Sequence, residues 1–126
     1  MIKSFRDLRV YQRSYELCLR IDRLTLSFPD FERYELGRQM REASRSIPAN
    51  IAEGYGRKKS ASDFKRFLQM ALGSCDEMTV WLDLAKDLGY LNEEDHRRLE
   101  ESYQEVGKGI SKLIQVWKGR AESSGF

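Results

Sequence analysis

Few side chains in this 126-residue chain have the type and spacing that catalysis requires. Asn50 and Glu53 lie one helical turn apart in the stretch S-I-P-A-N-I-A-E-G, beside an apolar pattern that neither of them fits. A catalytic carboxylate at Glu53 would need a second convergent group, and the surrounding segment offers only Glu42, on another face. The structural alternative is a buried carboxylate, which would need Arg41 or Arg45, from a helix of the same or an adjacent chain, as its partner. We expect no enzymatic activity.

The remaining reactive side chains predict neither a metal site nor a nucleophile. Cys18 and Cys75 each lie within an apolar helical pattern, which is typical of reduced thiols in a core. His96 is the only histidine, and we expect it to be solvated in the charged opening of a helix. No zinc-ligand spacing, phosphate-binding glycine loop or nucleophile motif occurs. We therefore expect no catalytic residue, no metal ligand and no cofactor.

Binding to an anion is the chemistry that the charge pattern favours. The segment 38–66 carries eight Lys/Arg against three Asp/Glu, whereas 67–126 carries seven against eleven. The candidate nucleic-acid-binding residues are Arg38, Arg41, Arg45, Arg57, Lys58, Lys59, Lys65 and Arg66. We expect the first three on the outer side of one helix and the others around a turn. Such a cluster would attract phosphate groups, but plain solvation of amphipathic helices is the alternative explanation.

These residues must be positioned by helices, because apolar residues recur with a helical period and strand-like alternation is absent. The periodicity predicts helices over about 7–28, 32–55, 61–88 and 93–118, with a frayed tail over 119–126. Four such helices predict an all-α fold, a four-helix bundle. At this length, 1–126 is expected to form one domain with a single core.

Local signals mark the helix ends. Pro29 disfavours helical geometry at the residue before it and so ends the first helix. Ser60 and Asn92 are followed three residues later by Asp63 and Asp95, and we expect each to cap the helix that follows. Gly89 is the residue able to close the third helix in a left-handed conformation.

Pro48 lies inside the second predicted helix, where it removes the hydrogen bond to the Ser44 carbonyl. We expect a bent helix and not a broken one, because the apolar stripe keeps its phase from Ile47 to Ile51. Ser44 and Ser46 are expected to bond the freed backbone group.

Two glycines follow near the end of the same helix. Gly54 and Gly56 are expected to permit close approach of another helix and an exit with positive φ. The structural or interface residues predicted from this segment are Pro48, Asn50, Glu53 and Gly54.

The apolar arcs of the helices predicted over 7–28 and 61–88 are wider than one bundle core needs. The excess predicts burial against a second copy of the chain, held by apolar contacts and some charged pairs. A thicker monomeric core is the alternative.

Several stretches resemble a known bacterial family. They are F-R-D-L-R-V-Y-Q at 5–12, F-P at 28–29, Y-E-L-G-R-Q-M-R at 34–41, S-I-P-A-N-I-A-E-G-Y-G-R at 46–57 and F-L-Q-M-A-L-G-S at 67–74. Together they resemble the proteins encoded in intervening sequences of bacterial 23S rRNA genes, which are related to the accessory variability protein of diversity-generating retroelements. The resemblance runs from about Phe5 to Leu91, and N-I-A-E-G is its most specific part.

The resemblance implies an up-down-up-down, left-handed bundle that assembles as a homo-pentamer with a positively charged surface. For the retroelement branch it also implies binding to nucleic acid and to a reverse transcriptase. Two functions are therefore expected: a module that binds RNA, DNA or a nucleic-acid enzyme, or a structural oligomer whose charges serve solubility and subunit contacts. No run is apolar enough to span a membrane and no signal peptide is recognisable, so we expect a cytoplasmic protein without a membrane partner.

Overall fold

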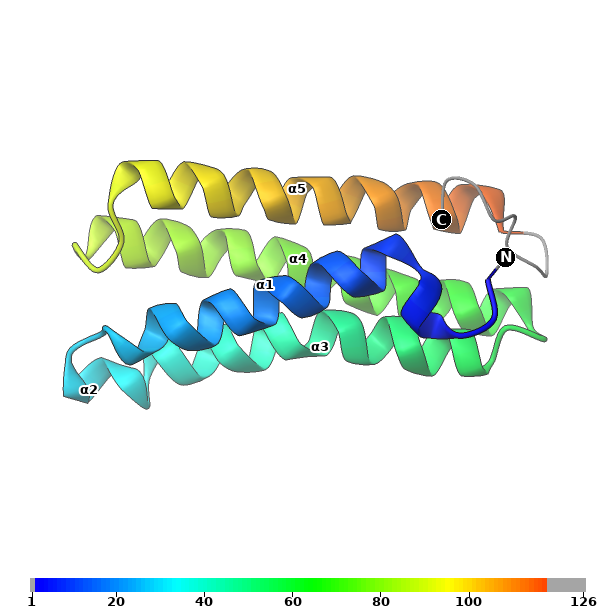
Figure 1. Ribbon diagram of the computed structural model, residues 1–126, viewed down its shortest axis with the longest axis horizontal. Coiled ribbons are helices and arrows are strands. Elements are labelled where there is room, and N and C mark those ends of the chain that lie inside the picture. The colour runs from blue at the N-terminus through cyan, green and yellow to red at the C-terminus, as the bar shows by residue number, and fades with distance from the viewer. Residues whose placement is uncertain (1, 118–126) are drawn as a thin grey trace.

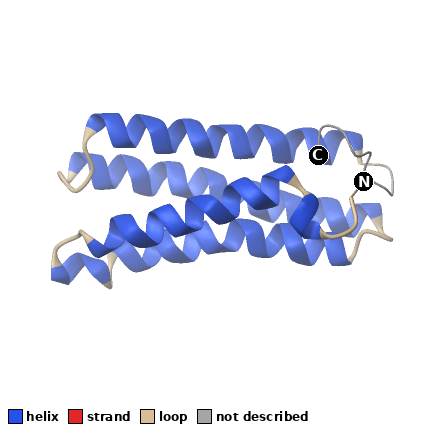
Figure 2. Ribbon diagram, viewed as in Figure 1, coloured by secondary structure: helices blue, strands red, loops and turns tan. Residues whose placement is uncertain are grey.

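The computed structural model describes residues 2–117, and these are helical apart from short connections (Figure 2). The helices are η1 (Phe5–Asp7), α1 (Arg9–Leu26), α2 (Asp30–Arg33), α3 (Leu36–Gly56), α4 (Ala61–Asp87) and α5 (Glu93–Val116). The predicted frayed tail, 119–126, lies outside the described residues.

Four long helices form the predicted up-down-up-down bundle. Each runs antiparallel to the next along the chain (Figure 1). α1 packs against α3 and α5, and α4 also packs against α3 and α5, so α1 and α4 lie diagonally opposite. The short connections place each long helix beside the next one along the chain. The last helix, α5, then closes the bundle by packing against α1.

The predicted helix signals are confirmed by the backbone. The Ser60 hydroxyl accepts a hydrogen bond from the Asp63 amide at 3.2 Å, and the Asn92 side-chain oxygen accepts one from the Asp95 amide at 2.8 Å. Gly89 takes φ +84° after the end of α4. These bonds satisfy backbone groups that the helix itself leaves free.

The second predicted helix, 32–55, is bent. It consists of α2 and α3, separated by Tyr34 and Glu35, and α3 continues through Pro48 without a break (Figure 1). A thiol from another helix bonds the carbonyl that the proline frees, since Cys18 Sγ lies 3.0 Å from the Ser44 oxygen. The expectation that serines would do this is wrong, because the Ser44 and Ser46 hydroxyls bond carbonyls three residues before them.

Gly54 allows a close approach of α3 to α4, as predicted, whereas Gly56 has no described atom within 4 Å of an added Cβ, so the same prediction for Gly56 is wrong. A Cβ at this position would lie 2.7 Å from Cβ of Phe67 and 3.0 Å from Cδ1 of Phe64. The predicted positive-φ exit from α3 is wrong, because Gly89 alone has positive φ among the described residues. The chain leaves α3 at Arg57 with φ −109°, which any residue can adopt.

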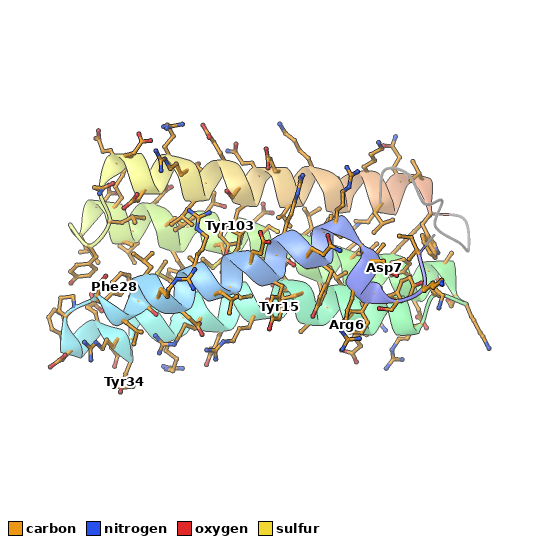
Figure 3. All side chains as sticks on the ribbon, viewed as in Figure 1. Arg6, Asp7, Tyr15, Phe28, Tyr34 and Tyr103 are labelled. Carbon is orange, nitrogen blue, oxygen red and sulfur yellow. The ribbon has the colours of Figure 1, made fainter. Side chains whose placement is uncertain are left out.

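All four long helices contribute to one apolar core. Its largest fully buried side chains are Tyr103, Phe64, Leu8, Ile21, Met40, Ile47, Ile51, Leu68, Met78, Leu82, Ile110 and Leu113. Figure 3 places Tyr103 in the middle of the bundle, and its hydroxyl has no hydrogen-bond partner among the residues that the structure describes. Burial raises the pKa of this phenol above its usual range.

Both cysteines are buried, free thiols, as predicted. Burial raises the pKa of Cys75 to about 12 and also raises the pKa of Cys18. Both thiols are therefore protonated at neutral pH, a state in which cysteine is a poor nucleophile and a poor metal ligand.

The two helices predicted to be over-wide do leave apolar side chains exposed. These are Tyr15, Leu19 and Leu26 on α1 and Met70, Val80 and Leu84 on α4, together with Leu88 directly after α4. Leu88 is the C-cap residue of α4 and lies beyond its last turn. No described helix has the length and apolar character needed to cross a membrane.

Candidate anion-binding surface

The eight predicted basic residues do not form one surface. Three lie along the first half of α3, and five surround the connection between α3 and α4. Arg57, Lys58, Lys59, Lys65 and Arg66 make up the second group, here called the basic end. The two groups differ in how their charges are compensated.

Arg41 is not an outer-surface residue, which corrects the prediction. Its side chain is half-buried, and its guanidinium donates to Oγ1 of Thr25 at 3.0 Å and to the Arg33 carbonyl at 2.9 Å. These bonds tie α1 and the end of α2 to α3. The helical period could not reveal this role, because it depends on where the preceding turn crosses the helix.

Arg38 and Arg45 are exposed, and both have acidic partners. Arg38 lies 3.4 Å from Glu42 on α3, and Arg45 lies 3.1 Å from Asp22 on α1. Exposed pairs of this kind add little stability, but each carboxylate reduces the attraction of its arginine for a phosphate. This half of α3 is thus a weaker anion site than its sequence suggests.

The basic end keeps most of its charge available. Arg57 and Arg66 have acidic neighbours only at 3.6 and 3.9 Å, Glu53 and Asp63 respectively. Within the described chain, Lys58, Lys59 and Lys65 form no ion pair. Their positions around a surface turn leave these ammonium groups available to an incoming anion.

Aromatic rings hold part of the basic end in place. The guanidinium groups of Arg57 and Arg66 lie 5.2 and 4.6 Å from the centre of the Phe67 ring, and the Lys58 ammonium lies 4.3 Å from that of Tyr55. Cation–π contacts of this kind restrict side-chain motion while leaving the charge in solvent. The Phe67 ring therefore positions the guanidinium groups of both arginines.

Among the described residues, Glu53 and Asn50 form polar contacts only within α3 and with its C-cap residue. Glu53 is exposed and pairs with Arg57, one turn further along α3. The expectation that this carboxylate is buried against Arg41 or Arg45 of the same chain is therefore wrong, and a partner from an adjacent chain stays a prediction. Asn50 is half-buried, and its amide donates to the Ser46 carbonyl at 2.8 Å, a bond within α3.

His96 differs most from its prediction. It is 8% exposed, and its Nε2 lies 2.7 Å from Oδ1 of Asp83 and 3.7 Å from Oε2 of Glu100. The expectation of a solvated histidine is wrong. One signal was present in the sequence: His96 precedes Leu99 and Tyr103 at steps of three and four, on the apolar seam of α5.

Comparison with known proteins agrees with this fold. Residues 6–112 match the family described as 23S rRNA-intervening sequence protein. The structure is similar to the crystal structure of a protein of unknown function from the S23 ribosomal protein family of Bacteroides thetaiotaomicron. The TM-score is 0.79 at 26% sequence identity, over 88% of this chain and 99% of the other. No curated protein sequence matches the chain. Because the family match covers most of its length, this chain belongs to the 23S rRNA-intervening sequence protein family.

Proposed function

We propose that this protein is a non-enzymatic, oligomeric binding module that contacts the phosphate backbone of RNA or DNA through the basic end. The observation that carries the proposal is the group of three lysines that have no acidic partner among residues 2–117, beside two arginines stacked on Phe67. Lysine and arginine on a helix exterior bind phosphates and carry little sequence information. Binding is therefore expected to be independent of sequence.

Assembly would strengthen a weak contact. A homo-pentamer presents the basic end five times, and linked contacts raise the apparent affinity through effective concentration. Each phosphate that is neutralised releases counterions, so affinity should fall steeply as salt rises. The basic end could also bind an acidic surface of a nucleic-acid enzyme, such as a reverse transcriptase. We include such an enzyme as a second possible partner in this proposal.

The test is a fluorescence-anisotropy titration of wild type with mixed-sequence RNA and DNA at about 50 mM salt, where phosphate contacts are strong. The triple variant Arg57→Glu, Lys58→Glu, Lys59→Glu should bind at least about tenfold more weakly, because three phosphate contacts are replaced by repulsion. Light scattering of the same variant should give an unchanged oligomer.

A matched control variant changes the net charge by the same amount as the triple variant, but at residues outside the basic end. Arg20→Glu, Arg23→Glu and Lys108→Glu alter three exposed basic side chains that form no ion pair in the described residues. This variant should retain most of the wild-type affinity if the basic end is the binding surface. Equal losses in both triple variants would mean that only net charge matters, and no binding by wild type would remove the proposal.

A structural oligomer that does not bind nucleic acid is the second candidate. The exposed apolar side chains of α1 and α4 favour it, since they suit subunit contacts whatever the basic end does. This candidate becomes the better one if wild type forms an oligomer and binds neither RNA nor DNA.

A further inference from the structure

Three side chains of metal-binding type converge between α4 and α5, away from the basic end. Asp83 comes from α4, and His96 and Glu100 lie one turn apart on α5. One ligand atom from each residue lies within 4.8 Å of those of the other two. The antiparallel packing of α4 and α5 creates this cluster.

The charges of the cluster are not balanced by protein groups. Asp83 and Glu100 both face Nε2 of His96, and across residues 2–117 neither carboxylate has a Lys or Arg within ion-pairing distance. One imidazole carries at most one positive charge against two negative ones. Two carboxylates held this close repel each other unless a cation lies between them.

The histidine adds a second, independent indication. Its side chain is almost fully buried, and its Nε2 is directed at both carboxylates. A neutral imidazole nitrogen is the most common protein ligand for transition metals. A single hydrogen bond to Asp83 would satisfy this nitrogen, but it would leave Glu100 without a partner.

We propose that Asp83, His96 and Glu100 bind a divalent transition-metal ion, with Zn²⁺ as the best fit. One nitrogen and two carboxylate oxygens suit Zn²⁺, at about 2.0–2.2 Å from each atom. Tetrahedral ligands then lie roughly 3.4 Å apart, so the 2.7 Å contact between His96 and Asp83 must open slightly. Asp83 is exposed and can rotate to do so. The bound ion would link α4 to α5, with a fourth position left for water.

The test is calorimetric titration of the full-length, tag-free chain with ZnCl₂ at neutral pH. We expect about one Zn²⁺ per chain, and an affinity at least about tenfold lower in His96→Gln and in Asp83→Asn, because each removes a ligand. Since the chain has one histidine, its imidazole proton resonances should shift or broaden at equimolar Zn²⁺. The buried, protonated thiols of Cys18 and Cys75 should not compete.

Asp87→Asn is the matched control, because Asp87 is exposed on α4 one turn beyond Asp83 and belongs to no ion pair among the described residues. It should bind Zn²⁺ like wild type. If His96→Gln fails to fold, the Asp83→Asn variant provides the test, because Asp83 is exposed and its substitution should not disturb folding. Absence of saturable binding, or binding that Asp83→Asn leaves unchanged, would overturn the three-ligand site.

Discussion

At the scale of single residues, Gly54 sets how closely α3 and α4 pack. The space for its missing side chain is filled by Phe64 and Phe67, with the nearest carbon atom at 2.7 Å from an added Cβ. We predict that Gly54→Ala lowers the free energy of unfolding by about 1–3 kcal/mol, because a buried methyl group forces backbone or aromatic shifts. Chemical denaturation measures the change.

Gly73 provides the matched control for this prediction. It lies within α4, is exposed, and has nothing within 4 Å of an added Cβ. Gly73→Ala should raise the free energy of unfolding by about 0.5–1 kcal/mol, since alanine loses less backbone entropy in a helix. Similar effects of the two substitutions would contradict a steric origin at Gly54.

At the scale of elements, the integrity of α3 depends on a bond from α1. Pro48 cannot donate to the Ser44 carbonyl, and the Cys18 thiol takes that place. Cys18→Ala should therefore cost about 1–3 kcal/mol, because it leaves a buried carbonyl unsatisfied. In a Pro48→Ala background the new amide can bond Ser44, so the same substitution should cost less.

A double-mutant cycle measures this coupling, which we expect to be roughly 0.5–1.5 kcal/mol. Cys75→Ala is the control, because Cys75 is also buried but its thiol bonds no carbonyl within residues 2–117. Its cost should be the same with proline or alanine at position 48. A coupling near zero for Cys18 would show that its bond to Ser44 does not compensate for the proline.

At the scale of the whole molecule, two separate apolar patches remain on the bundle surface. Leu19, 45% exposed, lies with Tyr15 beside a groove between α1 and α3, where Pro48 contributes to the lining. Val80, 59% exposed, begins a row on α4 that continues at steps of four through Leu84 and ends at Leu88, directly after the helix. Different patches on one chain suit head-to-tail contacts, which can close into a ring.

We predict that light scattering of wild type at micromolar concentration gives the mass of a homo-oligomer, and specifically of a pentamer. Leu19→Glu and Val80→Glu should each lower the measured mass toward that of a single chain, because a charge buried at an interface without a partner is costly. Gln104→Glu places the same charge on the exposed face of α5 and should leave the mass unchanged. A wild-type mass of one chain would contradict oligomerisation.

Local sequence signals were enough to predict the four long helices of the bundle, but not the separation of α2 from α3 or the short helix η1. Apolar spacing, the caps at Ser60 and Asn92, and the closing glycine Gly89 act over a few neighbouring residues, so they can be recognised along the chain. The same local information indicated that α3 continues through Pro48. It also predicted which thiols are buried, because both lie on helix faces with an unambiguous apolar stripe.

Only the tertiary structure decided which side chains meet across helices. Arg41 bonds groups on α1 and α2, Cys18 bonds the carbonyl of Ser44, and His96 meets Asp83 from the helix before it. Helical periodicity gives the face of each residue but neither the rotation nor the register of one helix against another. A shift of one residue turns a side chain by about 100° around the helix. Such a rotation is enough to move a side chain from the exposed surface to a buried contact with another helix.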